Sequence, residues 1–168
     1  MKGVKTMRLW HRELLPYLPD LQFKGQLREL VAIMHDWRDK KKTNHLLINK
    51  VMEYPKKHLT SYYLTYSREY FKRYGKRNVK LFHEFIDFSI YFFEKECEIH
   101  FENGFEKTVV GEMENIFPDW HNKEYLRVCM ANLYEKHFFG IGKSRITDEE
   151  WARLCEGYEQ ITGEKYQI

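Results

Sequence analysis

The chain has 168 residues, of which 43% are hydrophobic and 17% aromatic, a composition that suits one folded domain and argues against intrinsic disorder. No apolar run approaches the roughly 18 residues of a membrane-spanning helix, and the basic N-terminus leads into no apolar segment of the secretory type. Three widely spaced cysteines, Cys97, Cys129 and Cys155, favour neither a disulfide framework nor a zinc site.

Charge is distributed unevenly along the chain, although the net charge is only +3. Residues 1–80 contain 19 Lys and Arg against 7 Asp and Glu, whereas residues 81–168 contain 9 against 18. A basic N-terminal half is the electrostatic pattern expected of a protein that binds a polyanion such as nucleic acid. The alternative is a solvated charged surface that has no partner.

Apolar residues at helical spacing dominate the sequence, and they are punctuated by capping residues, glycines and prolines. The spacing predicts helices, in chain order, at 20–35, 44–53, 56–74, 78–97 and 122–137, and a last helix that opens with a capping box at Thr147–Glu150 and ends at Gly163. Residues 38–43 are expected to form a basic loop between the first two helices.

Residues 98–111 do not fit one pattern, because Gly104 is followed by a β-branched run, and a loop, a hairpin or a short helix all remain open. The predicted fold class is all-α, in a single multi-helix domain. We expect residues 1–6 to be an N-terminal extension, residues 7–137 to form the helical domain, and residues 138–168 to form a linker and a helix that packs on the same domain.

A polar face is predicted on the first long helix. Gln22, Gln26 and Glu29 lie at positions i, i+4 and i+7, which places them within about 40° of each other. Gly25 leaves room beside them for a ligand, and Arg28 neighbours the carboxylate in sequence. Surface helices commonly have a polar stripe opposite an apolar one, so this spacing alone does not establish a catalytic role.

A resemblance to a known family begins at Met7. The pyrimidine-dimer DNA glycosylases, in particular the bacterial relatives of phage endonuclease V, open in a way that resembles three blocks of this chain: Met7–His11, Leu18–Pro19 and Gln22–Glu29. The resemblance extends with gaps to about Lys136, through looser similarities at Trp37, His45, Ile48–Pro55, Phe117–His121 and Glu124–Leu126.

The resemblance implies a bifunctional DNA glycosylase and abasic-site lyase of base excision repair. In that family the α-amine of the mature chain attacks C1′ of the damaged nucleotide, displaces the base and forms an imine, and β-elimination then nicks the strand. On this resemblance the catalytic residues are Met7, which supplies the amine, and Glu29, which acts as acid and base. An α-amine has a reference pKa of roughly 8, so a useful fraction is neutral near pH 7.

The same resemblance implies a set of DNA-binding residues and a cellular setting. Arg8 and Arg28 suit phosphates, Gln22 stands where the family has a histidine, and Gln26 replaces an acidic residue of the phage enzyme. The predicted DNA-binding set is Arg8, His11, Gln22, Gln26, Arg28, Lys41, Lys42 and His45. We expect a cytoplasmic, nucleoid-associated monomer that acts on damaged double-stranded DNA without a cofactor or metal.

The sequence departs from the family at the nucleophile. As written, Met7 has an amide nitrogen, which cannot form an imine. Three interpretations stay open: the active chain begins at Met7, which we favour, or residues 1–6 are cleaved, or the extension is retained. With the extension retained, the protein uses Met1 or Lys5 or is a catalytically impaired relative. Two alternatives to an enzyme also stay open: a non-catalytic nucleic-acid-binding relative, and a helical interaction protein that shares only the fold.

A second candidate binding surface combines basic residues with tyrosines. Basic side chains suit phosphates, and aromatic rings can stack on bases, although tyrosines at helical spacing can equally belong to the core. The residues concerned are Lys40, Lys41, Lys42, Lys56, Lys57, Arg68, Lys72, Arg73, Lys76 and Arg77, with Tyr62, Tyr63, Tyr66, Tyr70 and Tyr74.

Overall fold

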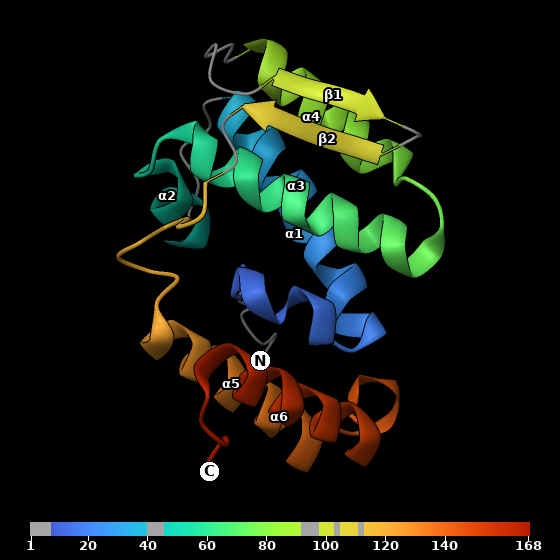
Figure 1. Ribbon diagram of the computed structural model, residues 1–168, viewed down its shortest axis with the longest axis vertical. Coiled ribbons are helices and arrows are strands. Elements are labelled where there is room, and N and C mark those ends of the chain that lie inside the picture. The colour runs from blue at the N-terminus through green and yellow to red at the C-terminus, as the bar shows by residue number, and fades with distance from the viewer. Residues whose placement is uncertain (1–7, 40–45, 92–97, 103–104, 111–112) are drawn as a thin grey trace, which may run out of the picture. The chain divides into compact units, whose positions relative to one another are not determined.

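The fold is built from helices and one β-hairpin (Figure 1). The computed structural model describes residues 8–39, 46–91, 98–102, 105–110 and 113–168. Its elements in chain order are η1 (Arg12–Tyr17), α1 (Asp20–Arg38), α2 (Leu46–Met52), α3 (Lys56–Tyr74), α4 (Val79–Tyr91), β1 (Glu98–Glu102), β2 (Phe105–Val110), α5 (Lys123–Phe138), η2 (Gly142–Ser144) and α6 (Asp148–Thr162). The all-α fold class is confirmed, and the hairpin is one of the alternatives that the sequence left open for residues 98–111.

Local signals account for the ends of these helices. Helix α3 begins and ends where predicted, and Gly75 terminates it with a φ of 65°, a conformation that costs glycine little. The capping box of α6 is present, with Thr147 and Glu150 each bonded to the backbone of the other. Helix α1 begins at Asp20, which pairs with Lys24 one turn later.

The described chain separates into two units. The first unit comprises Met1–Leu9 and Gln26–Phe117, and the second comprises Trp10–Gly25 and Pro118–Ile168. Helix α1 therefore contributes its first turns to the second unit and the remainder to the first. The predicted domain boundaries stay a prediction.

Helix α3 provides much of the core of the first unit. Tyr62, Tyr63 and Tyr66 are fully buried, and the ring of Tyr63 stacks on Phe85 of α4 with ring centroids 3.8 Å apart. Trp37 of α1 packs against Phe88 of α4. The antiparallel hairpin contacts α3 through β2. Three of the tyrosines that were candidates for base stacking are therefore core residues, because α3 turns this face toward the protein interior.

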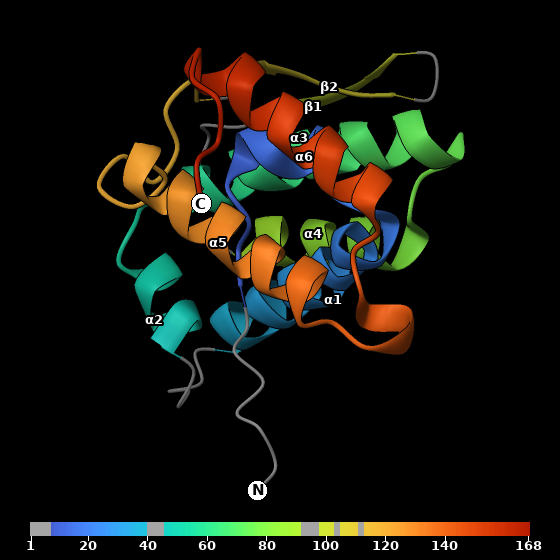
Figure 2. The same ribbon diagram turned by 90° about the horizontal axis from the view of Figure 1, so that it is seen from below.

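The second unit is built on the pair α5 and α6, which lie side by side in both ribbon views (Figure 2). Helix η1 packs on α6 at Gly157, where an added Cβ would clash with the Tyr17 ring. Two hydrogen bonds of 2.6 Å hold η1 there: the Tyr17 hydroxyl donates to Gln160 Oε1, and Arg153 donates to the Pro16 carbonyl. The last predicted helix thus packs within this unit. Among the helices described, none is both long and apolar enough to cross a bilayer.

Candidate active site

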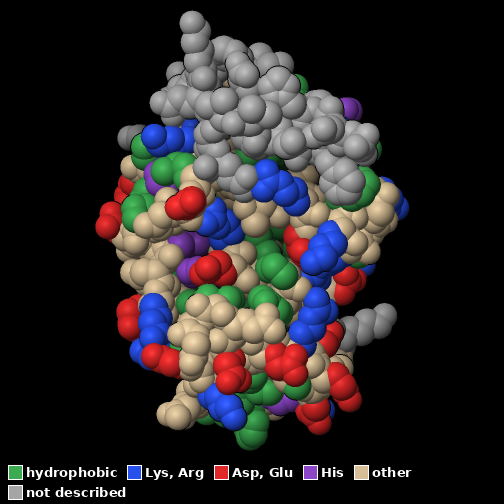
Figure 3. All heavy atoms as spheres, in the orientation of Figure 1, with side chains coloured by type: hydrophobic (Ala, Val, Ile, Leu, Met, Phe, Trp, Pro, Cys, Tyr) green, Lys and Arg blue, Asp and Glu red, His purple; other side chains and the backbone are tan. Residues whose placement is uncertain are grey.

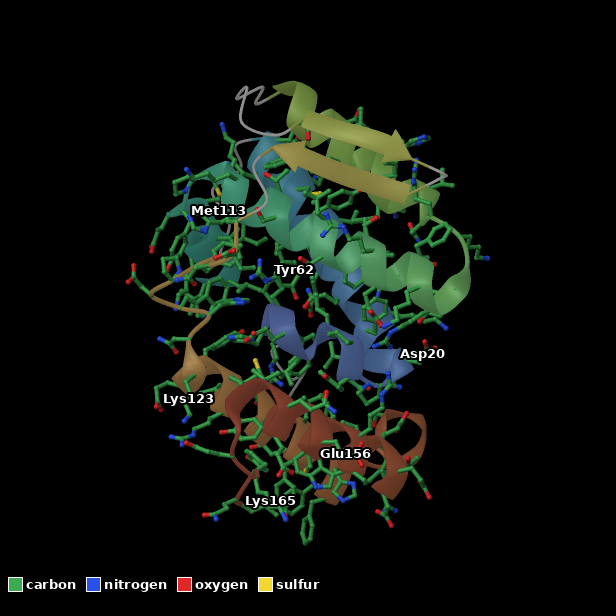
Figure 4. All side chains as sticks on the ribbon, in the orientation of Figure 1. Asp20, Tyr62, Met113, Lys123, Glu156 and Lys165 are labelled. Carbon is green, nitrogen blue, oxygen red and sulfur yellow. The ribbon has the colours of Figure 1, made fainter. Side chains whose placement is uncertain are left out.

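A buried glutamine is the centre of the polar network in the first unit. Gln26 is 0% exposed, and its Nε2 donates to the Arg8 carbonyl at 3.1 Å and to Glu29 Oε2 at 3.2 Å. Its Oε1 accepts a hydrogen bond of 3.1 Å from the hydroxyl of Tyr62, which Figure 4 labels on α3. One amide therefore joins the N-terminal segment, α1 and α3.

The predicted catalytic carboxylate lies one helical turn after Gln26. Because residues i and i+3 share a face of a helix, the side chains of Gln26 and Glu29 can meet, and one carboxylate oxygen accepts from the amide. Glu29 is only half-buried. A carboxylate that is anchored at one oxygen and still reaches solvent suits an acid or base that must contact a macromolecular substrate.

Arg8 and Arg28 both precede this carboxylate in sequence, and they differ in how they are held. Arg8 is half-buried, and its backbone is fixed by Gln26, while its neighbour Leu9 is fully buried in the core. Arg28 is exposed on α1, next to Glu29. The first unit therefore brings Arg8, Gln26 and Glu29 together, with Arg28 on the adjacent surface.

Two tyrosines of α3 hold α1 beside this network. Tyr62 bonds to Gln26, and Tyr66, one turn later, has its hydroxyl hydrogen-bonded to the backbone of Leu27. Burial raises the pKa of Tyr66, so the hydroxyl stays neutral. Because the two tyrosines contact consecutive residues of α1, they fix the position of the turn that carries Glu29. Sequence reasoning missed this role, and the only signal for it is the i, i+4 spacing of tyrosines on α3.

His11 belongs to the second unit and is buried. Its Nδ1 accepts from the backbone N–H of Glu13 at the start of η1, and its Nε2 lies 3.1 Å from the carbonyl oxygen of His121. An Nδ1 that accepts and an Nε2 that donates describe the neutral ring, and burial lowers the pKa of His11 in the same direction. These contacts give His11 a structural role and argue against the direct DNA contact expected from the sequence.

Gln22 also lies in the second unit, on the first turns of α1. It is half-buried, and its Oε1 has no hydrogen-bond partner among the residues that the structure describes. The remaining predicted site residues, Met7, Lys41, Lys42 and His45, lie outside the described residues, as does Lys40.

The tyrosine-rich helix exposes part of its predicted basic surface. Lys72 and Lys76 are exposed, whereas Arg73 is bonded to Glu69 at 2.8 Å and Arg77 lies over the ring of Phe82 at 4.3 Å from its centroid. On the face shown in Figure 3, acidic and basic side chains are interspersed over the C-terminal helices α5 and α6.

The comparison with known families concerns the segment that carries this site. Residues 7–82 match the family model of the pyrimidine dimer DNA glycosylases. The resemblance to this family is confirmed. The matched segment contains every member of the Gln26 network, namely Arg8, Gln26, Glu29 and Tyr62. No curated protein and no solved structure matches the chain significantly.

The glycosylase match ends within α4, and the looser similarities between residues 117 and 126 lie beyond it. These later similarities, and the assignment to a bacterial branch, stay predictions.

The second unit has a surface groove of about 790 Å³ along α5, the end of α6 and the C-terminal segment. Lys123 and Glu164 form an ion pair of 2.8 Å in this region, where Figure 4 labels Lys123 and Lys165. None of the predicted site residues lines this groove.

A metal centre is not indicated by the described part of the chain. No group of three or more His, Cys, Asp or Glu side chains is placed there to hold a metal ion. The chemistry that the described site offers is that of a carboxylate, an amide, a phenol and two guanidinium groups.

Proposed function

We propose that this protein is a DNA glycosylase with abasic-site lyase activity on damaged double-stranded DNA of the pyrimidine-dimer type. The observation that supports the proposal is the hydrogen-bonded link from the Arg8 backbone through Gln26 to Glu29, inside the segment that matches the glycosylase family. An imine-forming glycosylase needs an amine and a carboxylate beside the same sugar, and this link brings the start of the matched segment to the carboxylate.

The nucleophile in this proposal is the α-amine of Met7, in an active chain that begins at that residue. Successive Cα atoms lie 3.8 Å apart and the N–Cα bond is about 1.5 Å, so the nitrogen of residue 7 lies within about 5 Å of the Arg8 Cα. The carbonyl of Arg8 is bonded to the same amide as Glu29. Covalent geometry therefore ties this amine to the Arg8 backbone, and the two hydrogen bonds of Gln26 link that backbone to the carboxylate.

The reaction proceeds in three steps that the site can support. The neutral amine attacks C1′, the C1′–N bond breaks, and the base leaves with the bonding electron pair and takes up a proton. The amine then loses a proton, the C1′–O4′ bond opens with its electron pair going to O4′, and O4′ takes up a proton, which gives a protonated imine. Removal of a C2′ proton finally expels the 3′ phosphate. Glu29 stabilises the positive charge that develops at the sugar and carries the protons between these atoms.

Phosphate contacts are assigned to the cationic residues around this site. Arg28 is exposed beside Glu29, and we propose that it acts with Arg8, Lys41, Lys42 and His45 on the DNA backbone. Such contacts release counterions, so the affinity for DNA is expected to fall steeply with salt. We further propose that the enzyme works as a monomer in the cytoplasm, close to the nucleoid, and without a cofactor.

Borohydride trapping on a duplex with one abasic site tests this function. A chain that begins at Met7 should give a covalent adduct with the DNA and should nick the strand without borohydride. The same chain with its α-amine acetylated is the matched control and should bind the duplex without forming an adduct. Absence of an adduct from the free-amine chain would contradict the proposal, and retained binding would then favour the non-catalytic nucleic-acid-binding relative.

A further inference from the structure

We propose that Gln26 is the positioning residue of this active site, because its amide clamps the segment that carries the nucleophile to the carboxylate of Glu29. Tyr62 in turn fixes the amide. The inference rests on the proposed function and deepens it. It also replaces the direct DNA contact that the sequence analysis expected for Gln26.

The burial of Gln26 favours the positioning role over direct contact with DNA. At 0% exposure, its side chain cannot reach a phosphate or a base without rearrangement of the core. A polar side chain at that depth is retained when its hydrogen-bonding groups have partners. The partners here come from three separate elements: Arg8 in the N-terminal segment, Glu29 on α1 and Tyr62 on α3.

The chemistry of the partners requires an amide in one orientation. The Arg8 carbonyl and the Glu29 carboxylate are acceptors, and the NH₂ group of Gln26 provides one hydrogen for each. Tyr62 donates to Oε1. A flipped amide would place its oxygen against two acceptors, and a methionine of similar volume would satisfy none of the three partners. The side chain thus joins two acceptors that would otherwise repel each other.

The clamp acts on the peptide unit next to the proposed nucleophile. Leu9 is fully buried and anchors the chain by packing, and Gln26 holds the preceding carbonyl, so the direction in which the chain enters the site is fixed at two successive residues. Misplacement of a reacting group by about 1 Å can cost roughly 100-fold in rate. Loss of the clamp should therefore reduce the rate of the chemical steps and leave DNA affinity almost unchanged.

The test compares Gln26→Met with Tyr62→Phe, with Ser61→Ala as matched control, all in the chain that begins at Met7. Ser61 is buried next to Tyr62 on α3, and its hydroxyl accepts from the Met113 backbone, outside the network. Single-turnover rates of adduct formation and the Kd for abasic DNA are measured for each protein. Hydrogen exchange of the backbone amides of residues 8–10 is followed in parallel.

We expect Gln26→Met to lower the single-turnover rate about 100-fold with the Kd within about twofold of the wild type. Tyr62→Phe removes one oxygen atom and should lower the rate by about tenfold, while Ser61→Ala keeps the wild-type rate. Exchange of the amides near Arg8 should accelerate in Gln26→Met and not in Ser61→Ala.

Three results would overturn the clamp. An unchanged rate in Gln26→Met and in Tyr62→Phe would remove the positioning role. A weakened Kd with an unchanged rate would assign Gln26 to DNA contact instead. Unchanged exchange near Arg8 would show that Gln26 does not hold the segment, even if no protein forms an adduct. A separate outcome concerns the reaction itself. If the wild type forms no adduct while exchange is accelerated in Gln26→Met, the proposed reaction is overturned, and with it the role of Gln26 in catalysis. If Gln26→Met does not fold, Tyr62→Phe carries the same comparison.

Discussion

The two units of the molecule both bury polar side chains, and they use them differently. In the second unit, His11 is satisfied by backbone groups of Glu13 and His121, so its contacts stabilise local structure. In the first unit, Gln26 is satisfied by groups from three elements, and one of these is the half-buried carboxylate of Glu29. Burial of a polar residue therefore does not mark an active site by itself. A site is indicated where the buried group supports a side chain that reaches solvent.

The largest effect on the reaction rate should come from replacing Glu29, the member of the Gln26 network that reaches solvent. Glu29→Gln keeps the shape of the side chain and removes its charge and its ability to take up protons, so the single-turnover rate of base release should fall about 1000-fold. Affinity for damaged duplex should be unchanged or slightly higher, because one negative charge is lost. The control is Glu53→Gln, an exposed carboxylate in the same matched segment. Equal rates in the two variants would remove Glu29 from the mechanism.

Features that depend on neighbouring residues could be predicted from the sequence, whereas contacts between distant residues could not. Caps and helix ends such as Gly75 and Thr147 depend on neighbours in the chain, and they were predicted at the correct residues. The orientation of the tyrosines on α3 depends on what packs against that helix. Tyr62 and Gln26 are 36 positions apart, and no local pattern indicates that they meet. Glu29 was singled out as a candidate because helical spacing and family resemblance coincide there.

The second unit can be perturbed without touching the site. Gly157→Ala would place a Cβ against the ring of Tyr17, and overpacking of this kind typically costs about 1–3 kcal/mol in the free energy of unfolding. Chemical denaturation should show this loss. Replacement of the neighbouring exposed Glu156 by Ala should change stability much less, since that side chain points to solvent. A Gly157→Ala protein as stable as the wild type would mean that η1 does not pack on α6 as described.

The pH dependence of stability should reveal a buried neutral histidine in each unit. Burial lowers the pKa of His11 and of His58, whose Nδ1 accepts from the Phe117 backbone. A lowered folded-state pKa means that the unfolded chain binds the proton more readily, so this stability is present above about pH 6.5 and is lost as pH falls below it. Each histidine can contribute at most about 1.4 kcal/mol per pH unit. The free energy of unfolding, measured from pH 7.5 to 5, should decline less steeply in His11→Gln and in His58→Gln; identical slopes would contradict the assignment.

The smallest expected effect concerns the cap of the last helix. Thr147→Ala removes the hydroxyl that accepts from the Glu150 backbone, and loss of such a cap costs about 1 kcal/mol. Thermal unfolding should show a small decrease in Tm, while Thr147→Ser should preserve it because the hydroxyl remains. Adduct formation should be the same in both proteins, since the cap lies in the second unit. A change in the rate of adduct formation would show that the two units are coupled in catalysis.

Mapping the trapped adduct shows whether the amine of residue 7 reacts beside Glu29. The chain that begins at Met7 is reduced with borohydride on abasic DNA, digested and analysed by mass spectrometry. We expect the sugar remnant to be attached to the α-nitrogen of Met7 in the peptide that ends at Arg8. A remnant attached to a lysine side chain would contradict the account, as would the absence of any modified peptide.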